Sequence, residues 1–400
     1  MVQPGAFLAV IAAAAAGGTL SAMLGARGVL VPSVVVELVL GVLIGPQVAG
    51  LAVTEFIRFF SALGLGMLFF FAGYEINFER IEGEPLKLGA IGWVISLLLA
   101  YALAGALEAG DIVVSGLYTG SAMATTAIGT LLPILRDAGE LRTRFGPYLL
   151  AAGSVGEFGP ILLVTLVLST GHPLHEALIL VFFVALAVIT GVLAVRTAWR
   201  GWPLLERTFE TSSQLAVRLS VVLIFGLVAL ATQLGLDLLL GGFVAGMITR
   251  LALRGHELDV FESKLTAVGY GFLIPFFFVT SGMAFNVHEL FSNSSALLKL
   301  PLFVALFLVV RGVPAMLLYR SVLGLRDRSA LAVFCATELP LVVAITTLAE
   351  KAGDMRASTA SALVGAAIIS TLIFPLLGLR IRRDRPPEPG EPPQPLAAEA

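Results

Sequence analysis

The chain has 400 residues, of which 58% are hydrophobic and only 13% are charged, and its mean hydropathy is +0.97. A soluble chain of this length carries about 25% charged residues, so the composition excludes soluble enzymes, nucleic-acid-binding proteins and disulfide-stapled secreted domains. The net charge of −2 indicates no class of partner, and the single cysteine, Cys335, excludes an intrachain disulfide and a thiolate metal cluster.

Long apolar runs predict thirteen membrane-spanning helices. A run of about 18 or more apolar residues is typical of a helix that crosses the bilayer. The expected spans are 6–24, 30–46, 59–76, 86–107, 112–134, 147–169, 174–196, 214–234, 236–252, 264–285, 296–320, 329–349 and 357–379. We therefore expect an all-α, multi-pass membrane protein whose partner is the lipid bilayer.

The basic residues predict the orientation of these spans. Nineteen of the 25 Lys and Arg residues lie after odd-numbered spans, and four lie on the opposite side. By the positive-inside rule, the N-terminus is expected outside the cell membrane and the C-terminus in the cytoplasm. The Pro-rich residues 381–400 are expected to form a disordered cytoplasmic tail.

Three pairs of motifs, each seven spans apart, predict an internal duplication. ELVLGVLIG in span two resembles DLLLGGFVAG in span nine, FFFAGYEIN in span three resembles FFFVTSGMAFN in span ten, and ATT in span five resembles ATE in span twelve. Because seven is odd, the two halves enter the membrane in opposite directions, which is typical of secondary transporters with a site near the midplane. We expect one transport domain over 1–380, with repeat one over about 6–170, a linking helix at 174–196 and repeat two over about 214–380.

Ionisable residues inside the predicted spans are the candidates for function, because each costs about 2.5–3.5 kcal/mol at the bilayer centre on insertion scales. They are Glu37, Glu75, Glu157, Asp237, Arg311 and Glu338. Glu37 is either an entrance carboxylate or a group that is protonated at neutral pH. Glu75 and Asp237 lie nearer the span ends, where a wetted interface is the better explanation for them than a functional role.

Glu157 is the strongest candidate for an ion site. It lies in the segment AAGSVGEFGP, among small residues such as Ser154 and Gly156 that leave room for an ion. Pro160 cannot donate to the Gly156 carbonyl group, so we expect a free backbone oxygen beside the carboxylate. Hard cations bind to oxygen atoms of this kind. The alternative is a carboxylate neutralised by a structural arginine.

Two further spans are expected to be broken at their centres. Thr125 and Thr126 lie in the middle of span five, and Thr337 and Glu338 precede a proline in span twelve. Such breaks would place helix ends at the midplane, where the hydroxyl groups and Glu338 compensate the helix dipoles. For the threonines, ordinary hydroxyl-to-backbone bonds within a helix are the alternative.

Arg311 is the basic residue that lies deepest within the predicted spans. A charge in that environment is expected to be paired. Glu338, Glu157 and Glu75 are the candidate partners, and the pair is expected to be either structural or mechanistic.

On these motifs the chain resembles the monovalent cation:proton antiporter superfamily, in its sodium/hydrogen exchanger and Kef-type branch. FFFAGYEIN, TTAIGTLLPILRDAGELRTRFG, LLLGGFVAGMI and FFFVTSGMAFN carry the resemblance, which extends over about residues 6–380. It implies an inverted-repeat fold with a dimerising scaffold, a mobile core with two crossed broken helices, and homodimers that exchange Na+, K+ or Li+ for H+.

The resemblance also implies that Glu157 is the ion and proton site. The family usually has Asp there, preceded by Asp, Asn or Gln, whereas this chain has Gly156 and Glu157, and span ten contains no lysine of the kind found in some electrogenic relatives. These departures leave the cation and the stoichiometry open. If Glu157 is the sole exchanging carboxylate, the exchange is electroneutral and one-for-one, but Glu75, Glu338 or Asp237 could also titrate.

We therefore expect a secondary active antiporter that exchanges Na+ or K+ for H+ by alternating access, without a cofactor. One alternative is a cation- or proton-coupled symporter of a small organic anion, which would favour a positively charged pocket. Another is a degenerate transporter that acts as a sensor. An intramembrane enzyme is not expected, because HExxH and GxSxG are absent and the one histidine within the bounds of an expected span, His175, lies at the end of that span.

Overall fold

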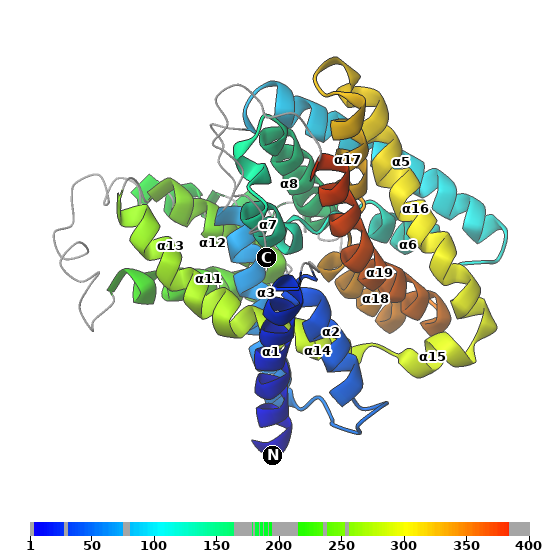
Figure 1. Ribbon diagram of the computed structural model, residues 1–400, viewed down its shortest axis with the longest axis horizontal. Coiled ribbons are helices and arrows are strands. Elements are labelled where there is room, and N and C mark those ends of the chain that lie inside the picture. Colours follow the sequence, from blue (N-terminus) through cyan, green and yellow to red (C-terminus); the bar gives the residue numbers. More distant parts are fainter. Residues whose placement is uncertain are drawn as a thin grey trace. The chain divides into compact units, whose positions relative to one another are not determined.

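The computed structural model describes residues 4–27, 31–74, 81–163, 178, 181–183, 185–186, 188–190, 192–193, 215–234, 238–252 and 256–383. Within this part the secondary structure is helical (Figure 1), and seven helices are long and apolar enough to cross a membrane. The all-α multi-pass class is thereby confirmed. Most of the predicted linking helix 174–196 and nearly all of the predicted tail 381–400 lie outside the described residues.

The chain divides into two compact units, and each unit combines a segment of the first half with a segment of the second half. Unit 1 comprises Met1–Val29, Ser33–Asn77 and Ile161–Phe285, and unit 2 comprises Leu30–Pro32, Phe78–Pro160 and Asn286–Ala400. The helices of the described part coincide with every expected span except 174–196, within a few residues at most ends. The largest difference is in span ten, which starts at His256 and contains a π-helical turn, η3 (Gly269–Leu273).

Unit 1 is held together by close contacts between helix backbones. Its helices are α1 (Pro4–Gly25), α2 (Ser33–Ile44), α3 (Glu55–Tyr74), α11 (Leu215–Gln233), α12 (Leu238–Ala252), α13 (His256–Val268) and α14 (Ile274–Ala284). In the pair formed by α2 and α14, a Cβ atom at Gly41 would lie 2.1 Å from the Val279 carbonyl oxygen, and one at Gly282 would lie 2.1 Å from that of Leu38. Only glycine allows backbones to approach this closely.

The pair formed by α3 and α12 repeats this contact. A Cβ atom at Gly246 would lie 2.0 Å from the Phe70 carbonyl oxygen, and one at Gly73 would lie 2.0 Å from that of Phe243. The motif of span nine therefore packs on that of span three in the same way as the motif of span two packs on that of span ten. This symmetry is what two inverted repeats produce.

Unit 2 contains two helices that are interrupted near their centres. Its elements are α5 (Glu84–Ala109), α6 (Gly116–Met123), α7 (Ile128–Asp137), η1 (Glu140–Arg142), α8 (Phe145–Leu163, which runs just past the unit boundary), α15 (Val287–Ser292), α16 (Ser294–Leu318), η4 (Tyr319–Ser321), α17 (Leu325–Cys335), α18 (Pro340–Ala352) and α19 (Ala357–Arg383). The chain is unwound between α6 and α7 and again between α17 and α18, and these two unwound segments are named the first and the second break. The breaks predicted from Thr125, Thr126, Thr337 and Glu338 are therefore present.

A buried ion cluster joins both halves of the chain within unit 2. The guanidinium group of Arg382, at the end of α19, is fully buried and forms ion pairs with Glu140 (Nε to Oε2, 2.7 Å) and with Asp327. It also lies over the ring of Phe145, 4.0 Å from the centroid. Because two carboxylates compensate one buried cation, this cluster fixes η1 against α17 and α19.

Candidate ion-binding site

Glu157, which lies on α8, caps the N-terminus of another helix, α7. Helix α7 begins after the first break, and its N-cap residue, Ala127, provides no side-chain hydrogen bond. Instead, the backbone N–H of Gly129 donates to Oε2 of Glu157 (3.1 Å), which lies on α8 and is 1% exposed. A carboxylate at this position is stabilised by the helix dipole and satisfies a backbone donor that the helix itself cannot satisfy.

The two breaks are in direct contact. The N–H of Ala127 donates to the Thr337 carbonyl oxygen (2.8 Å), and the Thr126 hydroxyl donates to the Cys335 carbonyl oxygen (2.6 Å). The N–H of Thr126 donates to the Gly156 carbonyl oxygen on α8 (3.0 Å). Three of the predicted site residues, Thr126, Gly156 and Thr337, therefore meet at the point where the broken helices cross.

One expectation about Gly156 was wrong. Pro160 lies inside α8 and leaves the Gly156 carbonyl group without its helical donor, as the sequence indicated. That oxygen is not free for a cation, however, because it accepts the hydrogen bond from Thr126. The proline therefore serves to attach the first break to α8.

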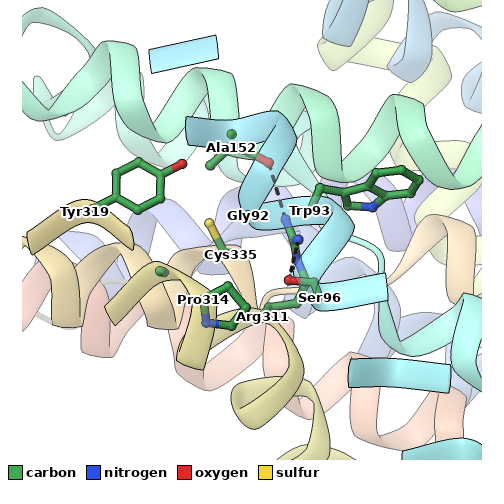
Figure 2. Close-up of a pocket in the computed structure, with 10 residues that line it drawn as sticks. Gly92, Trp93, Ser96, Ala152, Arg311, Pro314, Tyr319 and Cys335 are labelled. Carbon is green, nitrogen blue, oxygen red and sulfur yellow. Dashed lines mark hydrogen bonds between the residues drawn. The ribbon is translucent and has the colours of Figure 1, made fainter. Parts of the chain in front are cut away.

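Arg311 is anchored by hydroxyl and carbonyl groups. Its Nε donates to the Thr126 hydroxyl (2.9 Å), its Nη1 to the Ser96 hydroxyl (3.1 Å) and its Nη2 to the Ala152 carbonyl oxygen (3.3 Å). Figure 2 shows the last two of these bonds. The Thr126 hydroxyl thus accepts a hydrogen bond from Arg311 and donates one to the Cys335 carbonyl oxygen, so it links the Arg311 guanidinium group to both breaks.

Glu338, one of the three candidate partners, forms no direct ion pair with Arg311. Both carboxyl oxygens of Glu338 lie buried without a hydrogen-bond partner. Glu157 instead binds the N-terminus of α7, and the third candidate, Glu75, lies outside the described residues.

The absence of a side chain at Gly156 has a steric cause. A Cβ atom there would lie 2.3 Å from Nη2 of Arg311 and 2.8 Å from the Thr126 hydroxyl. The guanidinium group therefore occupies the space that a side chain at position 156 would need.

A small pocket lies beside Arg311 (Figure 2). Its volume is about 10 Å³, which suits no more than one water molecule. The polar or reactive groups in its lining belong to Trp93, Ser96, Arg311, Tyr319 and Cys335. The Trp93 indole N–H donates to the Ala124 carbonyl oxygen at the end of α6 (3.1 Å), so it compensates the C-terminal end of that half-helix.

The second break is held by hydroxyl groups of α19. The N–H of Glu338 donates to the Ser370 hydroxyl (3.0 Å), and the Glu338 carbonyl oxygen accepts from Ser370 (3.1 Å) and from Thr371 (3.2 Å). Ser370, Thr371 and Ser96 were not among the site residues predicted from the sequence. Hydroxyl residues inside apolar spans were the signal that could have identified them.

The other candidate residues take no part in the contacts between the two breaks described above. The Thr125 hydroxyl donates to the Ala122 carbonyl oxygen (3.1 Å), which is the ordinary backbone bond considered as the alternative, and Ser154 is buried on α8. Glu37 is buried on α2 in unit 1, and Asp237 lies outside the described residues. Among the residues that the structure describes, no group of three or more His, Cys, Asp or Glu side chains could hold a metal ion.

Comparison with known proteins identifies a matching family and related sequences. The family described as "Sodium/hydrogen exchanger, transmembrane" matches residues 9–379. YjbQ of Bacillus subtilis, whose name assigns it provisionally to Na+/H+ antiport, is 26% identical over 90% of this chain, and the Na+/H+-K+ antiporter GerN of Bacillus cereus is 25% identical over 63%. The matches cover 60% and 65% of those two proteins, respectively.

A solved structure has a similar fold. The sodium proton antiporter MjNhaP1 of Methanocaldococcus jannaschii aligns with a TM-score of 0.63 over 96% of this chain and 97% of its own, at 16% sequence identity. At this identity the likeness is one of fold.

Proposed function

Because the chain belongs to the sodium/hydrogen exchanger family, we propose that it is a secondary active antiporter that exchanges Na+ or K+ for H+ by alternating access. The observation that carries this proposal is Glu157, a buried carboxylate at the crossing of two broken helices. The names of YjbQ and GerN, which refer to Na+/H+ and Na+/H+-K+ antiport, support the choice of cations.

Competition at Glu157 provides the coupling. Burial disfavours a charged carboxylate, so the group takes up either a proton or a cation when the site is enclosed. The cation binds after the proton has left, and the proton binds after the cation has left. Exchange then needs no separate coupling device, because the two ions use the same carboxylate in turn.

The neighbouring residues have different roles in this proposal. Ser154, three residues before Glu157 on α8, and Thr125, in the first break, contribute oxygen ligands to a cation at Glu157. Thr126 is a positioning residue, because its hydroxyl is engaged by Arg311 and by the Cys335 carbonyl oxygen. Gly156 leaves the space that the guanidinium group occupies.

The assembly and orientation complete the proposal. Unit 1, with its interlocked glycine contacts, serves as the scaffold of a homodimer in the cell membrane, and unit 2 is the mobile core. The asymmetry of basic residues supports an external N-terminus and a cytoplasmic C-terminus. A symporter of organic anions is less well supported, because the pocket beside Arg311 has room for one water molecule.

Proton flux in proteoliposomes tests the proposal. Adding Na+, K+ and Li+ in turn should release protons with at least one of the first two cations. Glu157→Gln should abolish this flux, and Glu157→Asp should retain part of it. The matched control is Glu37→Gln, which removes a buried carboxylate from unit 1 and should leave the flux in place. Full cation-dependent flux in Glu157→Gln would refute the role of Glu157, and no flux in the wild type with any cation would refute antiport.

A further inference from the structure

Two long helices of unit 2 each expose an apolar stripe that ends in an arginine. In each stripe, two exposed apolar residues and an exposed arginine have the spacing i, i+4, i+7, which places them on one helix face. The two stripes consist of Val313, Leu317 and Arg320 on α16 and its continuation η4, and of Ile373, Leu377 and Arg380 on α19. A face of this kind presents its apolar part to acyl chains and its charged end to headgroups.

The arginines lie one bilayer thickness away from the other end of their helices. Near the starts of α16 and α19, Nζ of Lys299 donates to the Thr359 hydroxyl (2.9 Å), so this bond marks one level of both helices. From the bond to the arginine that ends each stripe, both helices are about 32 Å long at a rise of about 1.5 Å per residue. The hydrocarbon core of a bilayer is about 30 Å thick. This match places Arg320 and Arg380 at the level of the lipid headgroups.

The first turn of α17 joins the arginine-bearing ends of the two helices. Helices α16, α17 and α19 pack against one another (Figure 1). Nη1 of Arg328 on α17 donates to the Met316 carbonyl oxygen on α16 (2.8 Å), and Asp327 forms an ion pair with Arg382 on α19. Asp327 and Glu140 are both engaged by Arg382, so they do not neutralise the arginines of the stripes.

The arginines at this end have exposed guanidinium groups that await a partner. Arg320, Arg380 and the neighbouring Arg383 are exposed, and within the described part of the chain none of them forms a hydrogen bond or ion pair through its side chain. At the other end of these helices, Lys299 is buried and bonded to a hydroxyl group, and Arg356 is bonded to a backbone carbonyl group. Guanidinium groups bind phosphate oxygens through two parallel N–H donors.

We propose that the two stripes bind anionic phospholipid. The headgroup phosphate binds to Arg320 on one stripe and to Arg380, with Arg383 beside it, on the other. The acyl chains lie along the apolar residues of the stripes. This binding is separate from antiport and does not depend on it.

An anionic phospholipid fits the stripes better than a zwitterionic lipid or a soluble anion does. A choline headgroup brings a second cation beside the arginines and weakens the attraction to the phosphate. Soluble phosphate or an acidic peptide would leave the apolar part of each stripe without a partner. Basic residues beside a membrane-spanning helix attract anionic lipid electrostatically, and a phospholipid also supplies the apolar chain.

Native mass spectrometry of the full chain in a nonionic detergent measures lipid binding without transport. Phosphatidylglycerol and phosphatidylcholine with identical acyl chains are titrated separately. We expect the wild type to retain phosphatidylglycerol at lower concentrations than phosphatidylcholine. Excess glycerol 3-phosphate, which has the phosphate but no chains, should leave this binding in place. Equal retention of the two lipids would overturn the proposal, and so would displacement of phosphatidylglycerol by glycerol 3-phosphate or by polyglutamate, which would assign the surface to a soluble anion or an acidic peptide.

Substitutions assign the lipid to the stripes. Arg320→Gln combined with Arg380→Gln should weaken phosphatidylglycerol binding by about 30-fold, because each basic residue near the membrane surface contributes about fivefold. Binding of phosphatidylcholine should change little, and lysine at both positions should preserve most of the preference. The matched control, Arg58→Gln combined with Lys351→Gln, also removes two exposed positive charges and should bind phosphatidylglycerol as the wild type does. Wild-type affinity in the glutamine variant, or an equal loss in the control, would contradict a site at the stripes.

Discussion

The first and second breaks come from related sequences, yet they arrange a carboxylate and a hydroxyl group in opposite ways. In the first break, Thr126 lies in the unwound segment, and the carboxylate of Glu157 comes from the neighbouring helix α8 to bind the N-terminus of α7. In the second break, Glu338 lies in the unwound segment, and the hydroxyl of Ser370 comes from the neighbouring helix α19 to bind the backbone. The exchange of positions leaves Glu157 bonded to a helix end and leaves the Glu338 side chain without a bond.

The duplicated scaffold therefore places two acids in different environments. The Glu157 carboxylate has a fixed position because it accepts a hydrogen bond from the N-terminus of α7. The Glu338 carboxyl group is held by no hydrogen bond. Four predictions test the polar contacts of the two breaks, from the largest expected effect to the smallest.

Arg311→Ala should have the largest effect on stability. It removes three hydrogen bonds from a charged group that joins the first break to α5 and α8, and each such bond contributes about 1.5–3 kcal/mol. We expect a loss of about 3 kcal/mol or more, measured as thermal unfolding in detergent, and an intermediate loss for Arg311→Lys. Because no direct ion pair with Glu338 exists, adding Glu338→Gln should change the loss little. A large rescue by Glu338→Gln would show that the two groups pair directly.

Gly156→Ala should have a smaller effect, through overpacking. The added methyl group would lie 2.3 Å from Nη2 of Arg311 and 2.8 Å from the Thr126 hydroxyl, so both must move, at a cost of about 1–3 kcal/mol. The matched control is Gly105→Ala on α5, where a Cβ atom meets nothing within 4 Å. There the helix should become more stable by about 0.5–1 kcal/mol. Equal effects at the two glycines would contradict the close approach of Arg311.

Ser370→Ala should weaken the second break. It removes the acceptor for the Glu338 N–H and one of two hydroxyl donors to the Glu338 carbonyl oxygen, while Thr371 remains. We expect a loss of about 1–2 kcal/mol in detergent unfolding. Ser329→Ala, which removes an exposed bond to the Leu325 carbonyl oxygen on α17 and a weak contact with the Met316 sulfur (3.8 Å), is the control and should lie within about 0.5 kcal/mol of the wild type. A silent Ser370→Ala would show that this hydroxyl does not hold the break.

The smallest expected difference separates the two acids directly. Glu157→Gln weakens the cap of α7 by about 0.5–1 kcal/mol, because an amide oxygen still accepts from Gly129 but carries no charge. Glu338→Gln removes no hydrogen bond and should be neutral or slightly stabilising. Unfolding of both variants under one condition checks the order, and a greater loss for Glu338→Gln would mean that its carboxyl group has a structural partner.

The local sequence was sufficient for the helices and for the positions of the breaks. Apolar length sets a membrane span, and Thr125, Thr126 and Pro340 mark points where a helix is interrupted, so both properties can be read within a short window of residues. Glu157 could also be identified, because a charge within an apolar span is costly wherever its partners lie. The identity of those partners was not accessible in the same way.

Only the tertiary structure decided how the polar groups are satisfied. The bonds from Arg311 to Thr126, Ser96 and Ala152 join residues 185, 215 and 159 positions apart. An acidic partner was expected because charge complementarity is visible in a sequence, whereas hydroxyl and carbonyl groups are too common to be singled out. For the same reason the sequence identified Glu338 as an embedded acid, but only the packing of α19 against its backbone left the carboxyl group without a bond.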